Sequence, residues 1–134
     1  MDIVSSVLTV YRKTFTFRGR AQRSEFWWFA LVQAILVIAV AVVEMRLGWS
    51  ENGTAMFGEG PLSLTFHLGH LMTWISVTVR RFHDMDRSGW WVLLALMPIG
   101  SLIQVIWLAR RGTQGENRFG PDPLQPVQMA DVFA

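Results

Sequence analysis

Three long stretches of the chain contain no charged residue. They cover residues 26–43, 60–79 and 88–109 and are 18, 20 and 22 residues long. An α-helix needs about 20 mostly apolar residues to cross the roughly 30 Å hydrocarbon core of a bilayer. The pattern therefore predicts an all-α integral membrane protein with transmembrane helices over residues 26–47, 61–79 and 90–109.

Tryptophan positions and the first stretch favour the bilayer over a soluble helical bundle. A soluble bundle predicts a regular polar face on each helix, but Gln33 is the only polar side chain in residues 26–43. Six of the seven tryptophans fall at the predicted membrane boundaries, where an amphipathic ring is favoured, and Trp74 is the exception. The second stretch is the most polar of the three.

The third stretch carries a helix-breaking sequence, Pro98-Ile99-Gly100, at its centre. A single helix kinked at the proline is the simpler interpretation, and it places the following tail outside the cell. The alternative is a re-entrant hairpin of two half-helices, which returns the tail to the cytoplasm and requires protein or water to cover the irregular backbone. The pattern favours the kinked helix.

The two ends of the chain differ from its centre, although all 134 residues are expected to form a single membrane domain. Residues 1–16 predict an amphipathic surface helix, which either lies among the lipid headgroups or packs on the ends of the spans. Residues 48–61 predict a flexible connector, and residues 112–134 an irregular tail rich in proline and glycine. The apolar face of the surface helix consists of Ile3, Val4, Val7, Leu8, Tyr11 and Phe15.

The distribution of charged residues predicts how the chain is oriented in the membrane, and it indicates little about what the chain binds. Five basic residues precede the first stretch, one lies between the first and second, and three lie between the second and third. Basic residues in short loops remain in the cytoplasm, so the N-terminus and the second loop are predicted to be cytoplasmic. With 12 Lys+Arg against 10 Asp+Glu, the net charge of +2 gives no indication of nucleic-acid binding.

The chain lacks the usual residue patterns of an enzyme. It has no cysteine, which excludes disulfides, thiolate metal sites and thiol nucleophiles. No phosphate-binding loop and no catalytic pair with convincing spacing is present. We therefore expect neither enzymatic activity nor a bound cofactor or metal.

Two segments, residues 17–28 and 80–91, place charges directly before a tryptophan pair that opens an apolar stretch. They predict a cytoplasmic polar clasp, in which Glu25 pairs with Arg80 or Arg81 and fixes the packing of the spans. Contact with anionic lipid headgroups or a soluble partner is the alternative function. The candidate residues are Arg18, Arg20, Arg23, Glu25, Arg80, Arg81, His83, Asp84, Asp86 and Arg87.

A second candidate site comprises Glu44, His67 and His70. The two histidines are three residues apart and share one helix face, so they could bind a metal or haem iron, and Glu44 with His67 could bind a proton. Histidines that only form hydrogen bonds within a helical bundle are the more common case.

A third motif lies in the tail, Gly112-Thr113-Gln114-Gly115-Glu116-Asn117-Arg118-Phe119-Gly120-Pro121-Asp122-Pro123. In their order and spacing the three motifs closely resemble the DUF805 family, from about Tyr11 to Pro123. The Arg-Arg-x-His-Asp element alone also resembles the RDD family. The DUF805 resemblance implies a multi-pass protein of the bacterial inner membrane, and it implies no activity.

The sequence thus predicts an inner-membrane protein that interacts with lipids or partner proteins, in regulation or envelope stress. A homo-oligomer or a complex with another membrane protein is possible. The alternatives are a small oligomeric transporter or channel lined by Glu44, His67 and His70, and a haem- or metal-binding membrane protein.

Overall fold

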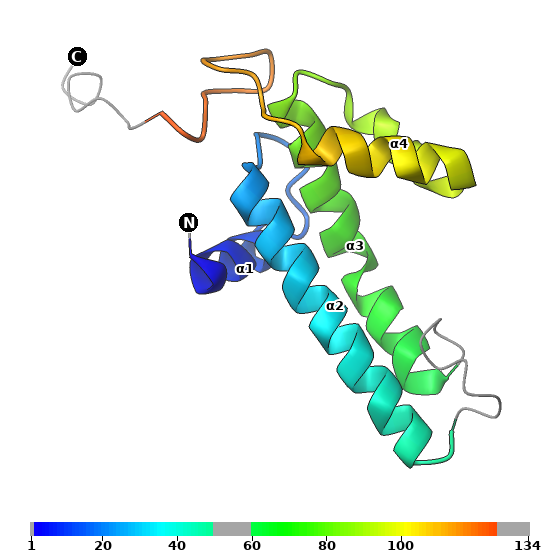
Figure 1. The fold of residues 1–134 in the computed structure, drawn as a ribbon. Coiled ribbons are helices and arrows are strands. Elements are labelled where there is room, and N and C mark those ends of the chain that lie inside the picture. The colour runs from blue at the N-terminus through cyan, green and yellow to red at the C-terminus, as the bar shows by residue number, and fades with distance from the viewer. Residues whose placement is uncertain (1, 50–59, 126–134) are drawn as a thin grey trace. The chain divides into compact units, whose positions relative to one another are not determined.

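The computed structural model describes residues 2–49 and 60–125, and the regular structure in these ranges is helical (Figure 1). An isolated bridge between Asn117 and Gly120 is the exception in the described ranges, so the all-α prediction is confirmed. The helices are α1 (Ile3–Arg12), α2 (Arg23–Arg46), α3 (Pro61–Asp84), the 3₁₀-helix η2 (Gly89–Leu96) and α4 (Pro98–Ala109).

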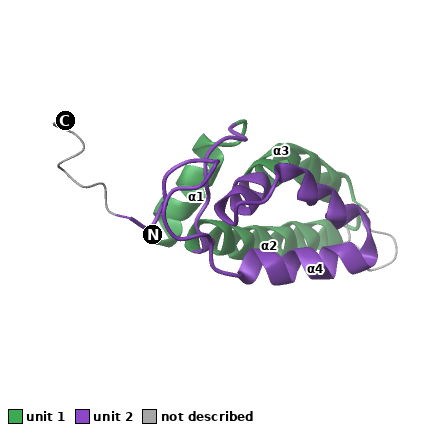
Figure 2. Ribbon diagram, turned by 90° about the horizontal axis from the view of Figure 1, so that it is seen from above, with its two compact units in different colours: residues 1–15, 24–76 green, residues 16–23, 77–134 purple. Residues whose placement is uncertain are grey.

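The chain divides into two compact units, each built from two separate segments (Figure 2). Unit 1 comprises residues 1–15 and 24–76, and unit 2 comprises residues 16–23 and 77–134. The predicted single domain stays a prediction. Most of the predicted connector and the end of the predicted tail, residues 50–59 and 126–134, lie outside the described residues.

Helix α2 of unit 1 corresponds to the first predicted span and begins three residues earlier, at Arg23. Among the described residues it is the one helix long and apolar enough to cross a membrane. A core helix of a soluble protein would bury its apolar side chains, whereas Ile35 and Ile38 are 57% and 55% exposed. Helix α3 is equally long but more polar, and the second predicted span stays a prediction.

Contacts at two levels show that α2 and the unit 1 part of α3 lie side by side and antiparallel. Near one end, the Glu44 side chain accepts a hydrogen bond from the backbone N–H of Leu62. Nearer the other end, the rings of Phe29 and Trp74 meet edge to face with their centroids 5.3 Å apart. Trp74, the tryptophan expected inside a span, thus serves helix packing.

Asp2 caps the N-terminus of helix α1, because its carboxylate accepts a hydrogen bond from the backbone N–H of Ser5 at 2.8 Å. Its side chains Ser6 and Val10 are buried, and Tyr11 contacts Phe29 of α2. Helix α1 therefore packs against α2 while most of its predicted apolar face remains exposed, and its location among lipid headgroups stays a prediction. The exposed apolar residues are Ile3, Val4, Leu8, Tyr11 and Phe15.

In unit 2, the third predicted span is divided at Met97. Proline disfavours helical geometry in the residue before it, and Met97 is extended, with φ −109° and ψ 133°. Pro98 then takes the first position of α4, where its missing N–H costs no hydrogen bond. A Cβ atom on Gly100 would overlap the carbonyl oxygen of Leu94, so glycine allows α4 to approach η2 closely.

The two halves of this segment fold back on each other as a hairpin. The rings of Trp91 in η2 and Trp107 in α4 are 5.3 Å apart, whereas sixteen residues of continuous helix would separate them by about 24 Å. The favoured prediction of a single kinked helix over residues 90–109 is therefore wrong. The alternative hairpin at Pro98–Gly100 describes the fold of this segment, which also has contacts between η2 and α4.

Candidate functional site

The charged motif residues of unit 2 meet at the carboxylate of Asp84, at the C-terminal end of α3. Its Oδ1 accepts a hydrogen bond from Nε of Arg20 at 3.0 Å, and its Oδ2 forms an ion pair with Arg81. All three side chains are buried, with at most 6% exposure. A Cβ atom on Gly112 would overlap this carboxylate, so glycine is required where the tail passes Asp84.

Arg81 connects the end of α3 to the end of α4. Its Nε donates to the carbonyl of Leu108 at 3.1 Å, and its guanidinium also donates to the carbonyl of Arg110. Leu108 lies in the last turn of α4 and Arg110 caps it, and the carbonyls at this helix end lack partners within the helix and attract a cation. Burial lowers the pKa of Arg81, while Asp84 opposes that shift.

Arg20 connects the N-terminal segment to the tail. Its two terminal nitrogens donate to the carbonyls of Thr113 and Gly115, at 2.5 and 2.6 Å. The backbone N–H of Thr113 donates to the carbonyl of Asp84 at 2.8 Å, which brings the tail against α3. The buried guanidinium therefore has its donors satisfied by a carboxylate and main-chain oxygens, as a buried charge requires.

His83 occupies the same buried network. Its ring stacks on Phe119 with centroids 3.9 Å apart and planes 3° apart, and its Nδ1 donates to the carbonyl of Gly19 at 3.2 Å. Gly19 has φ +82°, a conformation that glycine adopts readily. Gly89 is needed for space, because a Cβ atom there would lie 2.6 Å from a methyl group of Val79.

The remaining motif residues of unit 2 lie nearer the surface. Arg118 donates to Asp86 at 3.0 Å in a largely exposed ion pair, and the guanidinium of Arg87 lies 4.0 Å from the ring centroid of Trp107. Arg18 and Arg23 are exposed.

The predicted pairing of Glu25 with Arg80 or Arg81 stays a prediction. Glu25 belongs to unit 1 and is 4% exposed, and Arg80 belongs to unit 2 and is 1% exposed. The backbone carbonyl of Arg80 accepts a hydrogen bond from Ala21, which anchors the N-terminal segment to α3. The established partners of Arg81 are Asp84 and the end of α4.

The second candidate site is organised differently from the prediction. Glu44 is fully buried, and its Oε1 accepts hydrogen bonds from the backbone N–H groups of Leu62 and Ser63, at 2.6 and 2.9 Å. Its other oxygen accepts from the Ser63 hydroxyl. These N–H groups open α3, where the helix dipole favours a negative charge, so Glu44 of α2 caps the following helix.

The two histidines direct Nδ1 to the carbonyls four residues earlier, of Ser63 for His67 and of Phe66 for His70. Nε2 of His70 then accepts a hydrogen bond from the Tyr11 hydroxyl at 3.0 Å. His70 therefore has a hydrogen bond to another helix, as the common alternative expected, whereas the hydrogen bond of His67 to Ser63 stays within α3. Their use with Glu44 as a proton or ligand site stays a prediction.

The described residues contain no group of three or more His, Cys, Asp or Glu side chains that could hold a metal ion. Apart from the buried carboxylate and guanidinium groups of unit 2, the polar side chains there donate chiefly to main-chain oxygens, as Asn117 donates to the carbonyl of His83 at 2.9 Å. These hydrogen bonds hold the chain segments of unit 2 together and so stabilise its fold.

Several tail residues besides Gly115 and Phe119 belong to the network, and none of these tail residues was among the predicted site residues. Gly112 passes Asp84, Thr113 and Asn117 form hydrogen bonds to α3, and Asp122 lies 4.0 Å from Arg20. The tail motif was the available signal, because it combines small, amide and acidic residues in a segment with no helical pattern. Main-chain acceptors such as the Thr113 carbonyl have no signature in a sequence.

We expect unit 2 to lose stability as the pH falls from about 7 to about 5. Burial lowers the pKa of His83 below its usual value of 6.5, so the unfolded chain binds this proton more readily than the folded chain. The contribution is complete above the unfolded pKa and is lost as the pH drops through the folded pKa. Thermal unfolding in nanodiscs across this range should show a larger decrease for the wild type than for His83→Asn, whose amide can still donate to Gly19.

The helices and the buried charge network define an all-α protein whose motif residues hold its own chain segments together. The model of the DUF805 family, described as a protein of unknown function, matches residues 14–121. The chain therefore belongs to the DUF805 family, as its three motifs predicted.

Named relatives agree with this assignment. The inner membrane protein YhaH of Escherichia coli (strain K12) is 45% identical over 121 residues, covering 89% of this chain and 97% of YhaH. The inner membrane protein YhaI of the same strain is 37% identical over 118 residues, covering 87% and 92%. The uncharacterized protein YiiR is 30% identical over 151 aligned positions, covering 92% and 97%. No solved structure matches this chain.

Proposed function

We propose that this protein is a non-enzymatic, multi-pass component of the bacterial inner membrane that acts by contacting anionic lipid headgroups at the cytoplasmic surface. The supporting observation is that the arginines of unit 2 fall into two groups, one buried and one exposed. Its buried Arg20 and Arg81 pair with a carboxylate and donate hydrogen bonds to main-chain carbonyls, while other arginines remain exposed on the same unit. The exposed ones are Arg18, Arg23, Arg110, Arg111 and Arg118.

Charge supports a cytoplasmic surface for unit 2. Its described residues contain nine arginines against four carboxylates, a net charge of +5, whereas the described residues of unit 1 are balanced at three bases and three acids. Short cytoplasmic segments concentrate Lys and Arg, and the anionic inner leaflet attracts them. The N-terminus then also lies in the cytoplasm, and α2 and α3 cross the membrane.

The hairpin of η2 and α4 supports attachment of unit 2 to a single leaflet. Its turn exposes apolar side chains, with Leu96 81% and Ile99 75% exposed, while Arg87 and Arg110 lie at its open end. Eight 3₁₀ residues and twelve α-helical residues extend about 16 and 18 Å, close to half of the membrane. The hairpin therefore enters the cytoplasmic leaflet and returns the tail to the cytoplasm.

Lipid composition provides the functional test. In nanodiscs of phosphatidylcholine, replacement of part of the lipid by phosphatidylglycerol should raise the melting temperature of the wild type. The double variant Arg110→Gln/Arg111→Gln should lose most of that increase, because each basic residue near an anionic surface contributes about 1 kcal/mol. High salt should weaken the wild-type response in the same way.

The control is Arg46→Gln, which removes a charge at the far end of α2 and should retain the phosphatidylglycerol response. If the double variant responds as strongly as the wild type, lipid headgroups are not the partner of these arginines. Crosslinking of a protein to position 111 in native membranes, lost in the same double variant, would then assign the surface to a protein partner.

A further inference from the structure

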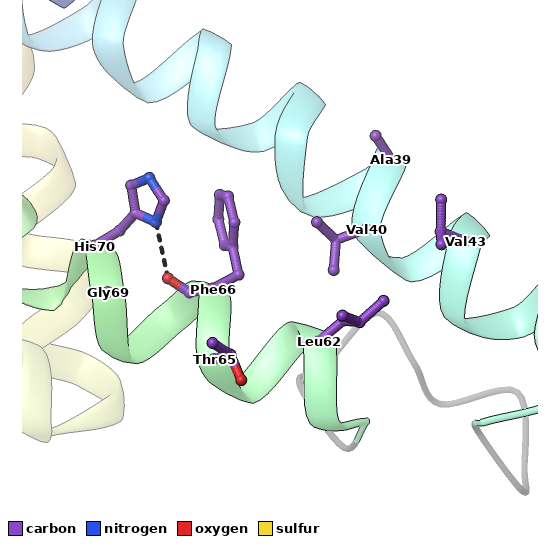
Figure 3. Close-up of a pocket in the computed structure, with 8 residues that line it drawn as sticks. All are labelled: Ala39, Val40, Val43, Leu62, Thr65, Phe66, Gly69 and His70. Carbon is purple, nitrogen blue, oxygen red and sulfur yellow. Dashed lines mark hydrogen bonds between the residues drawn. The ribbon is translucent and has the colours of Figure 1, made fainter.

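A groove of about 430 Å³ lies between α2 and α3 within unit 1 (Figure 3). Its size is in the usual range of ligand sites, about 300–1,000 Å³. Figure 3 shows α2 contributing one wall and α3 the other. The lining residues are Ala39, Val40, Val43, Leu62, Thr65, Phe66, Gly69 and His70.

The polar atoms on the walls of the groove are already engaged. The Thr65 hydroxyl donates to the carbonyl of Pro61 at 2.7 Å. Nδ1 of His70 donates to the carbonyl of Phe66 at 2.8 Å, and its Nε2 accepts from the Tyr11 hydroxyl, which in turn accepts from the Gln33 amide at 2.8 Å. The side-chain donors of the groove are thus used within unit 1, and the rest of its lining is apolar, so a hydrocarbon is the occupant that fits it.

Length and surroundings restrict the hydrocarbon further. On α3 the groove runs from Leu62 to His70, about 12 Å of helix, which is most of the roughly 15 Å that one leaflet contributes to the bilayer core. Its rims continue into exposed apolar side chains, with Val43 43% and Leu68 62% exposed. A single chain from one leaflet therefore fits the groove.

Gly69 gives the groove its depth. A Cβ atom at this position would meet no heavy atom within 4 Å, so no neighbouring side chain of the described residues requires glycine there. A glycine in the interior of a helix lowers helix stability unless close approach of another group compensates. An acyl chain lying against the backbone of α3 would provide that contact.

We infer that the α2–α3 groove binds one acyl chain of a membrane phospholipid, with His70 and Tyr11 closing its inner end. The inference rests on the proposed crossing of the membrane by α2 and α3. It assigns a resident lipid to unit 1, separate from the headgroup contacts of unit 2.

The test uses the protein in nanodiscs with a small fraction of phosphatidylethanolamine that carries a diazirine in one acyl chain. After illumination and proteolysis, lipid attachment to peptides covering 39–43 and 62–70 should exceed attachment to the rest of α2 severalfold. Gly69→Leu, whose Cβ atom would meet no heavy atom within 4 Å, extends a side chain into the groove and should reduce this labelling severalfold. Ala39→Leu fills the groove from α2 and should have the same effect if Gly69→Leu folds poorly.

Ala34→Leu is the matched control, because it adds the same side chain at an exposed position of α2 outside the groove. Even labelling of all exposed helix faces, unchanged in Gly69→Leu, would overturn the inference and leave only ordinary surrounding lipid. Disulfide dimers of a Thr65→Cys variant would overturn it in favour of a second copy. Absence of lipid on every α2 peptide would instead contradict the proposed membrane crossing.

Discussion

Asp84→Ala is expected to destabilise the protein by about 3–5 kcal/mol, the usual cost of removing one partner from a buried ion pair. The change leaves the guanidinium groups of Arg20 and Arg81 buried without the carboxylate they share. Since domains are stable by only about 5–15 kcal/mol, much of the folded population should be lost. Melting temperature and monodisperse yield in detergent measure the effect.

Asp86→Ala is the matched control for this prediction. Asp86 lies two residues further along the chain and pairs with Arg118, but 42% of its side chain is exposed, so its loss should cost under about 1 kcal/mol. Asp84→Asn should fall between the two alanine variants, because it retains hydrogen-bonding oxygen but no charge. Equal melting temperatures for both alanine variants would show that the buried network contributes no more than a surface pair.

The tail is expected to remain in the cytoplasm. Because the chain has no cysteine, single cysteines can be placed at Ser5, Gly53, Ser88 and Gln125 without a background signal. An impermeant thiol reagent added to cells with a permeabilised outer membrane should label only position 53, in the loop between the first two predicted spans. All four positions should react after the inner membrane is disrupted.

Position 125 distinguishes the two topologies. If α2 and α3 cross the membrane and the hairpin enters one leaflet, positions 88 and 125 lie on the same side. External labelling at position 125, with position 88 protected, would mean that the third segment crosses the bilayer after all. Labelling at position 5 from outside would reverse the predicted orientation of the whole chain.

Helix content and the grouping of the motif residues could be predicted from the sequence, and their partners could not. The long stretch without charged residues identified α2. The charges that flank the tryptophan pairs identified Arg20, Arg81, His83 and Asp84 as candidate site residues. The sequence suggested Glu25 as a partner of Arg80 or Arg81, and that pairing stays a prediction. The structure gives Arg81 two kinds of partner, Asp84 three residues along the same helix and the carbonyls of Leu108 and Arg110 at the end of α4. A charge pattern indicates which groups need partners, but main-chain acceptors depend on where distant helices end.

The hairpin and the role of Glu44 could not be predicted from the sequence for the same reason, because both depend on contacts between separate elements. Pro98 is compatible with both a kinked helix and a break, and the decision depends on the close approach of Gly100 to the Leu94 carbonyl, a tertiary contact. Glu44 was singled out because an ionisable group near the membrane is unusual. Its use as a cap for α3 follows only when α2 and α3 are known to be antiparallel neighbours.

The attachment of Arg20 to the tail sets an order for biosynthesis. The hydrogen bond from Arg20 to the Thr113 carbonyl joins residues 93 positions apart, so its acceptor leaves the ribosome long after the guanidinium does. Until then Arg20 must remain hydrated, and unit 2 cannot close. Unit 2 is therefore completed late in synthesis, and a translation product that stops before Gly112 leaves the terminal guanidinium donors of Arg20 without their main-chain acceptors in the tail, by which a protease or chaperone could distinguish it.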